Sequence, residues 1–277
     1  MSARSSARAS IARSTGVREL EPLIKEPQTV ESVADPLGTK LVTFVLSVIA
    51  GSVDVIGFLG LGTLFIAHIT GNLVILAARS AAGEPASAAH LLSVPVFIIV
   101  LVAARLLAAR LDRSGIATLR PLLLLQFLLL SGPLAIFVEV GSPADPNAAI
   151  MIVAAMLGVS AMAVQNALVQ LSLKDAPSTA VMTTNLTRFV LDLGEVWLGT
   201  NPDGRAKAMA RARRTGVAIA GFVAGSGLGA WCQAHVGLWS LVMPTGLALA
   251  ALVIAYCSRW FVQAADHDQS PVRGEAV

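Results

Sequence analysis

Charged residues are scarce in this sequence. Only 13% of its 277 residues are Asp, Glu, Lys or Arg, whereas 55% are hydrophobic. A soluble domain usually carries about 25% charged residues. So few charges cannot cover a water-soluble surface, and the excess apolar side chains need lipid as a second solvent. The composition therefore excludes an ordinary soluble domain and predicts an all-α, polytopic membrane helix bundle.

Cysteines are few, and enzyme motifs are missing. Cys232 and Cys257 lie inside apolar runs without CxxC spacing, so we expect them to be small buried hydrophobic residues. The four histidines are far apart, and no GxSxG, HExxH or P-loop pattern occurs. We therefore expect neither an enzyme nor a bound metal or cofactor. The Arg clusters between apolar runs indicate membrane topology rather than a nucleic-acid partner.

Long apolar runs fill most of the chain. A helix that crosses a bilayer needs about 20 mostly apolar residues. Two segments, 63–78 and 179–198, are shorter or more polar than that and remain ambiguous. The runs that meet the requirement are residues 40–60, 89–111, 119–140, 147–171, 215–235 and 238–261.

The two ends of the chain differ from its centre. Residues 1–38 are rich in Ser, Ala and Arg, and residues 263–277 are also polar. Low hydrophobicity is typical of disordered segments, so we expect both ends to be disordered cytoplasmic tails. The membrane part then divides into a first half, 39–140, and a second half, 147–262.

Loop charges predict the topology. Arg is frequent at 105–120 and 203–214, whereas 139–146 and 233–239 contain no Lys or Arg. Basic loops stay in the cytoplasm, so six crossings with both termini inside a bacterial inner membrane fit the pattern. The two ambiguous segments are then re-entrant or interfacial. An N-terminus outside the cell is the open alternative, and the segment 63–78 would then span.

A short internal repeat supports two related halves. Residues 70–73 read TGNL and residues 183–186 read TTNL, and each stretch follows one apolar span and precedes two more. Because the first half begins inside and the second outside, the halves are predicted to be inverted 3+3 repeats. Inverted repeats with discontinuous helices are typical of secondary transporters.

The run at 50–77 resembles the YoaK-like family of uncharacterised bacterial integral membrane proteins. The resemblance rests on Gly51 and Asp54 in the first span, and on Phe65 followed by Thr-Gly-Asn at 70–72. It covers roughly residues 40–262 and implies a membrane architecture without an assigned activity.

The later motif of that family is Gln-Asn followed by a Thr-Gly-Asn-like stretch. Here Gln165 and Asn166 stand before TTN at 183–185, and Thr184 occupies the place where Gly is more usual. The second segment therefore departs from the family pattern at its turn.

Asp54 is the most deeply placed acid in the clear spans. An Asp at a helix centre costs about 2.5–3.5 kcal/mol on insertion scales, so it faces a cavity or a partner. It is a candidate for proton exchange or for binding a cation or amine. The alternative is a structural partner for Arg105, Arg188 or the turn at 70–72.

His68, Thr70, Gly71 and Asn72 form the second group of candidate binding residues. Gly71 permits a sharp turn or a close backbone approach. A half-helix that begins near Thr70 would direct free N–H groups at a ligand, with Thr70 as its N-cap. The alternative is that Thr70 and Asn72 merely cap a broken helix and that His68 bonds locally.

The second half supplies further candidates. Gln165 or Asn166 could line a cavity or join helices through amide hydrogen bonds. Thr183 and Asn185 correspond to Thr70 and Asn72 through the repeat.

Two patterns are interpreted as packing rather than binding. Arg188 and Asp192 have i,i+4 spacing, which favours an ion pair within one helix. Gly221, Gly225 and Gly229 recur every four residues, which predicts close approach to a neighbouring helix.

Together these features predict a secondary transporter or channel for a small molecule or ion. Alternating access would occur around Asp54 and the segment at 70–72, with proton coupling through Asp54. The competing interpretation is a non-transporting membrane scaffold or assembly factor. The partners expected are the lipid bilayer, the unidentified substrate and a second copy of the chain.

Overall fold

The computed structural model describes residues 36–85, 87–141, 148–173, 176–179 and 181–268. In this part of the chain all regular structure is helical, which confirms the all-α part of the predicted fold class. The expected tails lie mostly outside it, although 36–38 and 263–268 belong to helices. The elements are α1 (Pro36–Gly60), α2 (Ile69–Ala81), α3 (Ala88–Arg113), α4 (Leu119–Val140), α5 (Ala149–Ser172), α6 (Met182–Leu198), α7 (Pro202–Val236), the 3-10 helix η1 (Gly237–Leu241) and α8 (Val242–Asp268).

Helix lengths identify which elements are long enough to cross a bilayer. Length and hydropathy give five candidate spans among the described residues. Four coincide with α1, α3, α4 and α5, and the fifth, Pro202–Cys257, is 56 residues long. This last segment contains two helices, because the chain reverses at Gly237, where φ is +57°. The helix α2 has only 13 residues, too few to cross a bilayer by itself.

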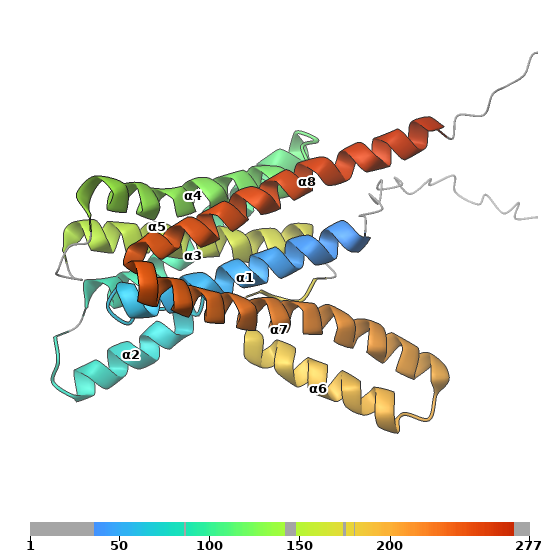
Figure 1. Cartoon of the computed structure of the whole chain (residues 1–277), viewed down its shortest axis with the longest axis horizontal. Coiled ribbons are helices and arrows are strands. Elements are labelled where there is room, and N and C mark those ends of the chain that lie inside the picture. Colours follow the sequence, from blue (N-terminus) through green and yellow to red (C-terminus); the bar gives the residue numbers. More distant parts are fainter. Residues whose placement is uncertain (1–35, 86, 142–147, 174–175, 180, 269–277) are drawn as a thin grey trace, which may run out of the picture. The chain divides into compact units, whose positions relative to one another are not determined.

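The helices pack as a bundle whose centre is formed by α1 and α5. The most extensive contact joins α1 to α7, while α5 packs on both α3 and α4 (Figure 1). The helix α8 contacts α1 and α4, and α6 contacts α7. The apolar core accordingly comprises side chains mainly from α1, α4 and α5. These buried helices position the polar residues described below.

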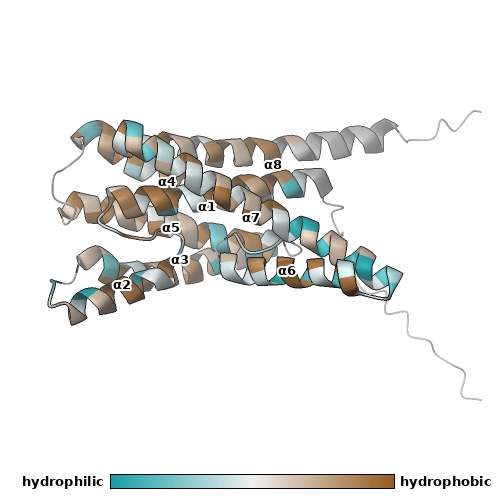
Figure 2. Cartoon of the chain, turned by 60° about the horizontal axis from the view of Figure 1, so that its bottom comes forward, coloured by the Kyte–Doolittle hydropathy of each residue, from teal (hydrophilic) through white to brown (hydrophobic). Residues whose placement is uncertain are grey.

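Many large apolar side chains face outward. Ile99 on α3 is 67% exposed, and Leu191 on α6 is 68% exposed. Hydrophilic residues gather instead where α6 ends and α7 begins (Figure 2). Apolar flanks with polar ends are the distribution that a bilayer requires. Multi-pass membrane helices in contact with lipid account for both features.

The two cysteines differ from the prediction of burial. Cys232 is half-buried and Cys257 is exposed. Apolarity of the surrounding run does not imply burial here, because a membrane helix can leave small hydrophobic side chains on the face that contacts lipid.

The glycine ladder of α7 lies directly against α1. A Cβ atom at Gly225 would lie 2.2 Å from the backbone oxygen of Val48, and one at Gly221 would lie 2.8 Å from the backbone oxygen of Phe44. A Cβ atom at Gly229 would lie 2.9 Å from Ser52. Only glycine at these three positions permits this separation of the α1 and α7 backbones.

Candidate functional site

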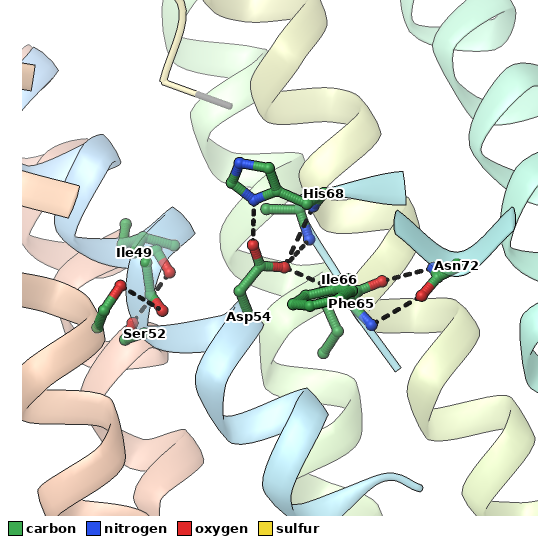
Figure 3. A network of polar contacts seen from close by, with 10 residues as sticks. Ile49, Ser52, Asp54, Phe65, Ile66, His68 and Asn72 are labelled. Atoms are coloured by element: carbon green, nitrogen blue, oxygen red, sulfur yellow. Dashed lines mark hydrogen bonds and ion pairs between the residues drawn. The ribbon is translucent and has the colours of Figure 1, made fainter. Parts of the chain in front are cut away.

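The Asp54 carboxylate organises the non-helical segment between α1 and α2. Its Oδ1 atom accepts hydrogen bonds from the backbone N–H groups of Ile66, Ala67 and His68, at 2.9, 2.6 and 3.2 Å (Figure 3). Asp54 is only 3% exposed. Interrupting a helix leaves backbone donors without partners, and lipid offers none. Asp54 therefore satisfies three donors that the break in the helix creates.

His68 contacts the other oxygen of the same carboxylate. Its Nδ1 atom is hydrogen-bonded to Asp54 Oδ2, and its ring packs edge-on against Phe222 of α7, with 5.3 Å between ring centroids. The His68 side chain is 32% exposed, whereas the Asp54 side chain is 5% exposed. The imidazole is thus the accessible member of the pair.

The carboxylate also changes the acid–base behaviour of this histidine, which lies between the candidate spans. The hydrogen bond to Asp54 raises the pKa of His68, and the negative charge of Asp54 adds to the effect, while burial opposes it. The protonated imidazole is therefore stabilised by its nearest charged neighbour.

Asn72 holds the same segment from the side of α2. Its Oδ1 atom accepts from the Phe65 backbone N–H at 2.9 Å, and its Nδ2 atom donates to the Phe65 carbonyl at 2.8 Å. Asn72 is fully buried. One amide side chain thereby satisfies both backbone polar groups of Phe65. Gly71 is needed beside it, because a Cβ atom there would lie 2.8 Å from the Phe65 ring.

The turn that begins this segment has an unusual backbone. Gly62 and Thr63 have φ values of +73° and +66°, and the second is costly for a residue with a branched Cβ. Arg79 of α2 donates to Thr63 Oγ1 at 3.0 Å, and a ring nitrogen of His90 on α3 lies 3.3 Å from the Thr63 carbonyl oxygen. Two helices therefore stabilise the strained turn.

A second polar cluster surrounds Gln165 of α5. Gln165 Nε2 donates to the Leu46 carbonyl of α1 and to Thr179 Oγ1, each at 2.9 Å. Its Oε1 atom accepts from Gln126 Nε2 of α4 at 2.7 Å. Gln126, Gln165 and Thr179 are all buried. This cluster joins α1, α4 and α5 to the segment that precedes α6, and it carries no charge.

The beginning of α6 repeats the arrangement at the beginning of α2. Asn185 Nδ2 donates to the carbonyl of Ser178, seven residues earlier, at 2.5 Å. Asn72 donates to the carbonyl of Phe65 across the same interval. Each Asn is the fourth residue of its helix, and each is buried.

The other predicted binding residues lie apart from these clusters. Thr70 and Thr183 are exposed, and Asn166 donates to the Met162 carbonyl of its own helix at 2.9 Å. The predicted N-cap role of Thr70 is wrong, because α2 begins at Ile69 and its N-cap position is His68 without a side-chain cap. The backbone donors are satisfied by Asp54 instead.

Two predicted ion pairs differ in the structure. Asp192 pairs with Arg211 of α7 at 2.7 Å rather than with Arg188 of its own helix. The expected partners of Asp54, namely Arg105, Arg188 and the turn at 70–72, are replaced by His68 and the backbone just before that turn. Both differences arise from tertiary contacts that sequence spacing does not contain.

Several residues of the site were missed from the sequence. Gln126 is the one amide in its apolar span, so the rule that singles out Asp54 would also have found it. Phe222 and Thr179 give no such signal, because an aromatic and a hydroxyl residue are common in membrane helices. Among the described residues, no group of three or more His, Cys, Asp or Glu could hold a metal ion.

Comparison with known proteins identifies a family for most of the chain. The family described as "Protein of unknown function (DUF1275)" matches residues 42–254. No curated protein and no solved structure matches the chain. The matched range includes both polar clusters and every helix from α1 to α8 in whole or in part.

Proposed function

The chain belongs to this DUF1275 family of unknown function, and from its structure we propose that it is a secondary transporter or channel for a small molecule or an ion. Transport, rather than catalysis, fits a bundle whose buried polar groups lie where helices are interrupted. The main supporting observation is the break at residues 61–68, whose backbone is bound by the buried Asp54 carboxylate and leads to a half-exposed His68. Non-helical backbone at membrane depth is tolerated only when it is buried in protein or lines a cavity.

Six crossings of a bacterial inner membrane accompany this proposal. A single helix of 56 residues would be about 84 Å long at 1.5 Å per residue, far longer than a bilayer is thick. Counting α7 and α8 separately therefore supports the six-crossing topology. The start of α1 and the connection between α6 and α7 lie at one end of the bundle (Figure 1). The basic residues of 203–214 assign that end to the cytoplasm.

The helix contacts support inverted halves. Exchanging α1, α2, α3 and α4 for α5, α6, α7 and α8 converts the contact of α1 with α7 into that of α5 with α3. The same exchange relates α2–α3 to α6–α7, and α4–α5 to α8–α1. The paired hydrogen bonds of Asn72 and Asn185 follow the same correspondence. Rocking of one half against the other would then expose the break in α1–α2 to each side alternately.

A flux assay tests the proposal. Reconstituted wild-type protein should move substrate or protons across liposomes, followed with an internal pH-sensitive dye during screens of pooled metabolites and salts. Asp54→Asn should change that flux by an order of magnitude, because the carboxylate supports the discontinuous segment. Asp192→Asn is the matched control, since Asp192 is also a buried acid but pairs with Arg211 away from the break.

A membrane scaffold is the alternative, and one observation favours it. Both oxygens of Asp54 already have partners inside the protein, as a purely structural residue would. Wild-type liposomes without flux for any pool would support the scaffold. Equal flux in wild type and Asp54→Asn would keep transport but remove Asp54 from its mechanism.

A further inference from the structure

Asp54 and His68 differ in how much of their hydrogen-bonding capacity is already used. Asp54 Oδ1 already accepts three backbone hydrogen bonds, and Oδ2 is bonded to His68 Nδ1. The ring nitrogen Nε2 of His68 has no hydrogen-bond partner in the part of the chain that the structure covers. Its side chain is about six times more exposed than that of Asp54, 32% against 5%. The free lone pair of the site thus belongs to the imidazole.

We propose that Nε2 of His68 is the proton-binding atom of this membrane site and that Asp54 is a positioning residue. In the deprotonated state, neutral His68 donates its Nδ1 proton to the Asp54 carboxylate, and the pair carries a charge of −1. An incoming proton adds to the Nε2 lone pair and forms an imidazolium, and the pair becomes neutral. No other co-reactant is required. The biological role of this proton, as the coupling ion, rests on the proposed transport function.

The surroundings of His68 leave Asp54 as the dominant electrostatic partner. The helix α1 contributes Asp54, and α7 contributes the uncharged Phe222 within a stretch, 215–234, that has no charged residue. The first seven residues of α2, 69–75, are also uncharged. Among the described residues, Asp54 is accordingly the charged group that contacts His68 directly.

In the described part of the second half, the contact that corresponds to the Asp54–Ile66 contact has no titratable group. Gln165 donates to the side-chain hydroxyl of Thr179, six residues before Asn185, whereas Asp54 accepts from the backbone N–H of Ile66, six residues before Asn72. Gln165 is an amide and Thr179 a hydroxyl, and neither titrates at physiological pH. The correspondence therefore predicts one proton per protein chain, bound in the first half alone.

Nitrogen NMR of the intact protein in lipid bilayers tests this inference directly. Histidine labelled with ¹⁵N reports both the tautomer and the protonation of each ring, and His68→Gln identifies the His68 signals. We expect neutral wild-type His68 to carry its proton on Nδ1 and to gain the second on Nε2 as the pH falls. A proton on Nε2 in the neutral wild-type ring, or the absence of any titration between about pH 5 and 9, would overturn the proposal.

Asp54→Asn separates positioning from mere structural support. The Asn oxygen can still accept from the three backbone amides, but its Nδ2–H would donate to His68 Nδ1. The neutral ring should therefore switch to the Nε2–H tautomer, and proton affinity should fall at least about tenfold because the opposite charge is lost. His235, which bonds to Trp231 within its own helix, should not change. An unchanged tautomer and midpoint in a folded variant would refute the role of Asp54, and the wild-type tautomer decides the question if the variant does not fold.

The outcomes are independent of the flux assay. Titration of His68 Nε2 without any transport would leave the proton site intact and refute the transporter. Transport without titration of His68 would refute the proton site and leave the transporter intact.

Discussion

Single side chains replace the hydrogen bonds that two interrupted helices lack. Asp54 and Asn72 bind the backbone of residues 65–68 before α2, while Gln165 and Asn185 bind residues 178 and 179 before α6. All four side chains are buried. Asp54, Asn72 and Asn185 bind backbone groups, whereas Gln165 donates to the side-chain hydroxyl of Thr179. A buried backbone group without a partner costs about 1–3 kcal/mol. These residues therefore contribute to folding whatever the protein carries.

Asn72→Ala should destabilise the protein. It leaves both the N–H and the carbonyl of Phe65 without their side-chain partner, at a cost of about 1–3 kcal/mol in the free energy of unfolding. Denaturant titration in mixed micelles measures this change. Thr70→Ala is the control, because Thr70 is exposed on the same helix and its loss should cost less than about 0.5 kcal/mol. Equal stability of the two variants would contradict the assigned role of Asn72.

At the scale of elements, hydropathy was sufficient to find the membrane helices. The run 119–140 coincides with α4, and the run 89–111 differs from α3 by one residue at its start and two at its end. Loop charge also suggested that 63–78 does not cross, and α2 has only 13 residues. The length and the hydropathy of an apolar run are local properties of the chain, so the sequence alone can predict such helices.

Contacts between elements were harder to predict from the sequence. The i,i+4 rule paired Arg188 with Asp192, but α7 brings Arg211 to 2.7 Å from that carboxylate. The N-cap rule selected Thr70, yet the donors near the start of α2 are satisfied by Asp54 of α1. Both rules consider one helix in isolation. A side chain from another helix forms the hydrogen bond or ion pair instead wherever tertiary packing places a stronger acceptor or donor nearby.

The contact of α1 with α7 allows a test with matched glycines. Gly225→Ala places a Cβ atom 2.2 Å from the Val48 backbone oxygen, so the two helices must separate. We expect a loss of about 1–3 kcal/mol in the free energy of unfolding. Gly227→Ala, two residues away, meets nothing within 4 Å and should be nearly neutral. Thermal unfolding in the same detergent compares the variants, and similar melting temperatures would exclude close packing at Gly225.

At the scale of the whole molecule, α2 and α6 would each belong to a re-entrant segment. Each segment would leave the membrane on the side from which it entered. The end of α2 lies at the same end of the bundle as the end of α4 and the η1 turn (Figure 1). The end of α6 lies at the opposite end, beside the basic start of α7. A re-entrant segment in each half, entering from opposite faces, is what an inverted pair of halves requires.

Cysteine labelling in intact cells tests this arrangement. In a background with Cys232 and Cys257 replaced by Ala, Cys at Glu84, just after α2, should react with a membrane-impermeant maleimide added outside. Cys at Thr200, between α6 and α7, should react only after the membrane is permeabilised, because it adjoins the basic start of α7, which the positive-inside rule predicts to be cytoplasmic.

Two positions calibrate the labelling. Cys at Glu139 near the end of α4 should behave like Glu84, and Cys at Ser114 after α3 should behave like Thr200. If a Cys at Thr39, near the start of α1, labelled from outside together with Glu84, an even number of crossings would separate the two positions, and the segment containing α2 would cross the membrane as α1 does. The first half would then have an even number of crossings, and it could not be inverted relative to a second half with three. The half-exposed His68 would in that case lie within a crossing segment rather than at a re-entrant break, so this comparison decides which geometry carries the proposed proton.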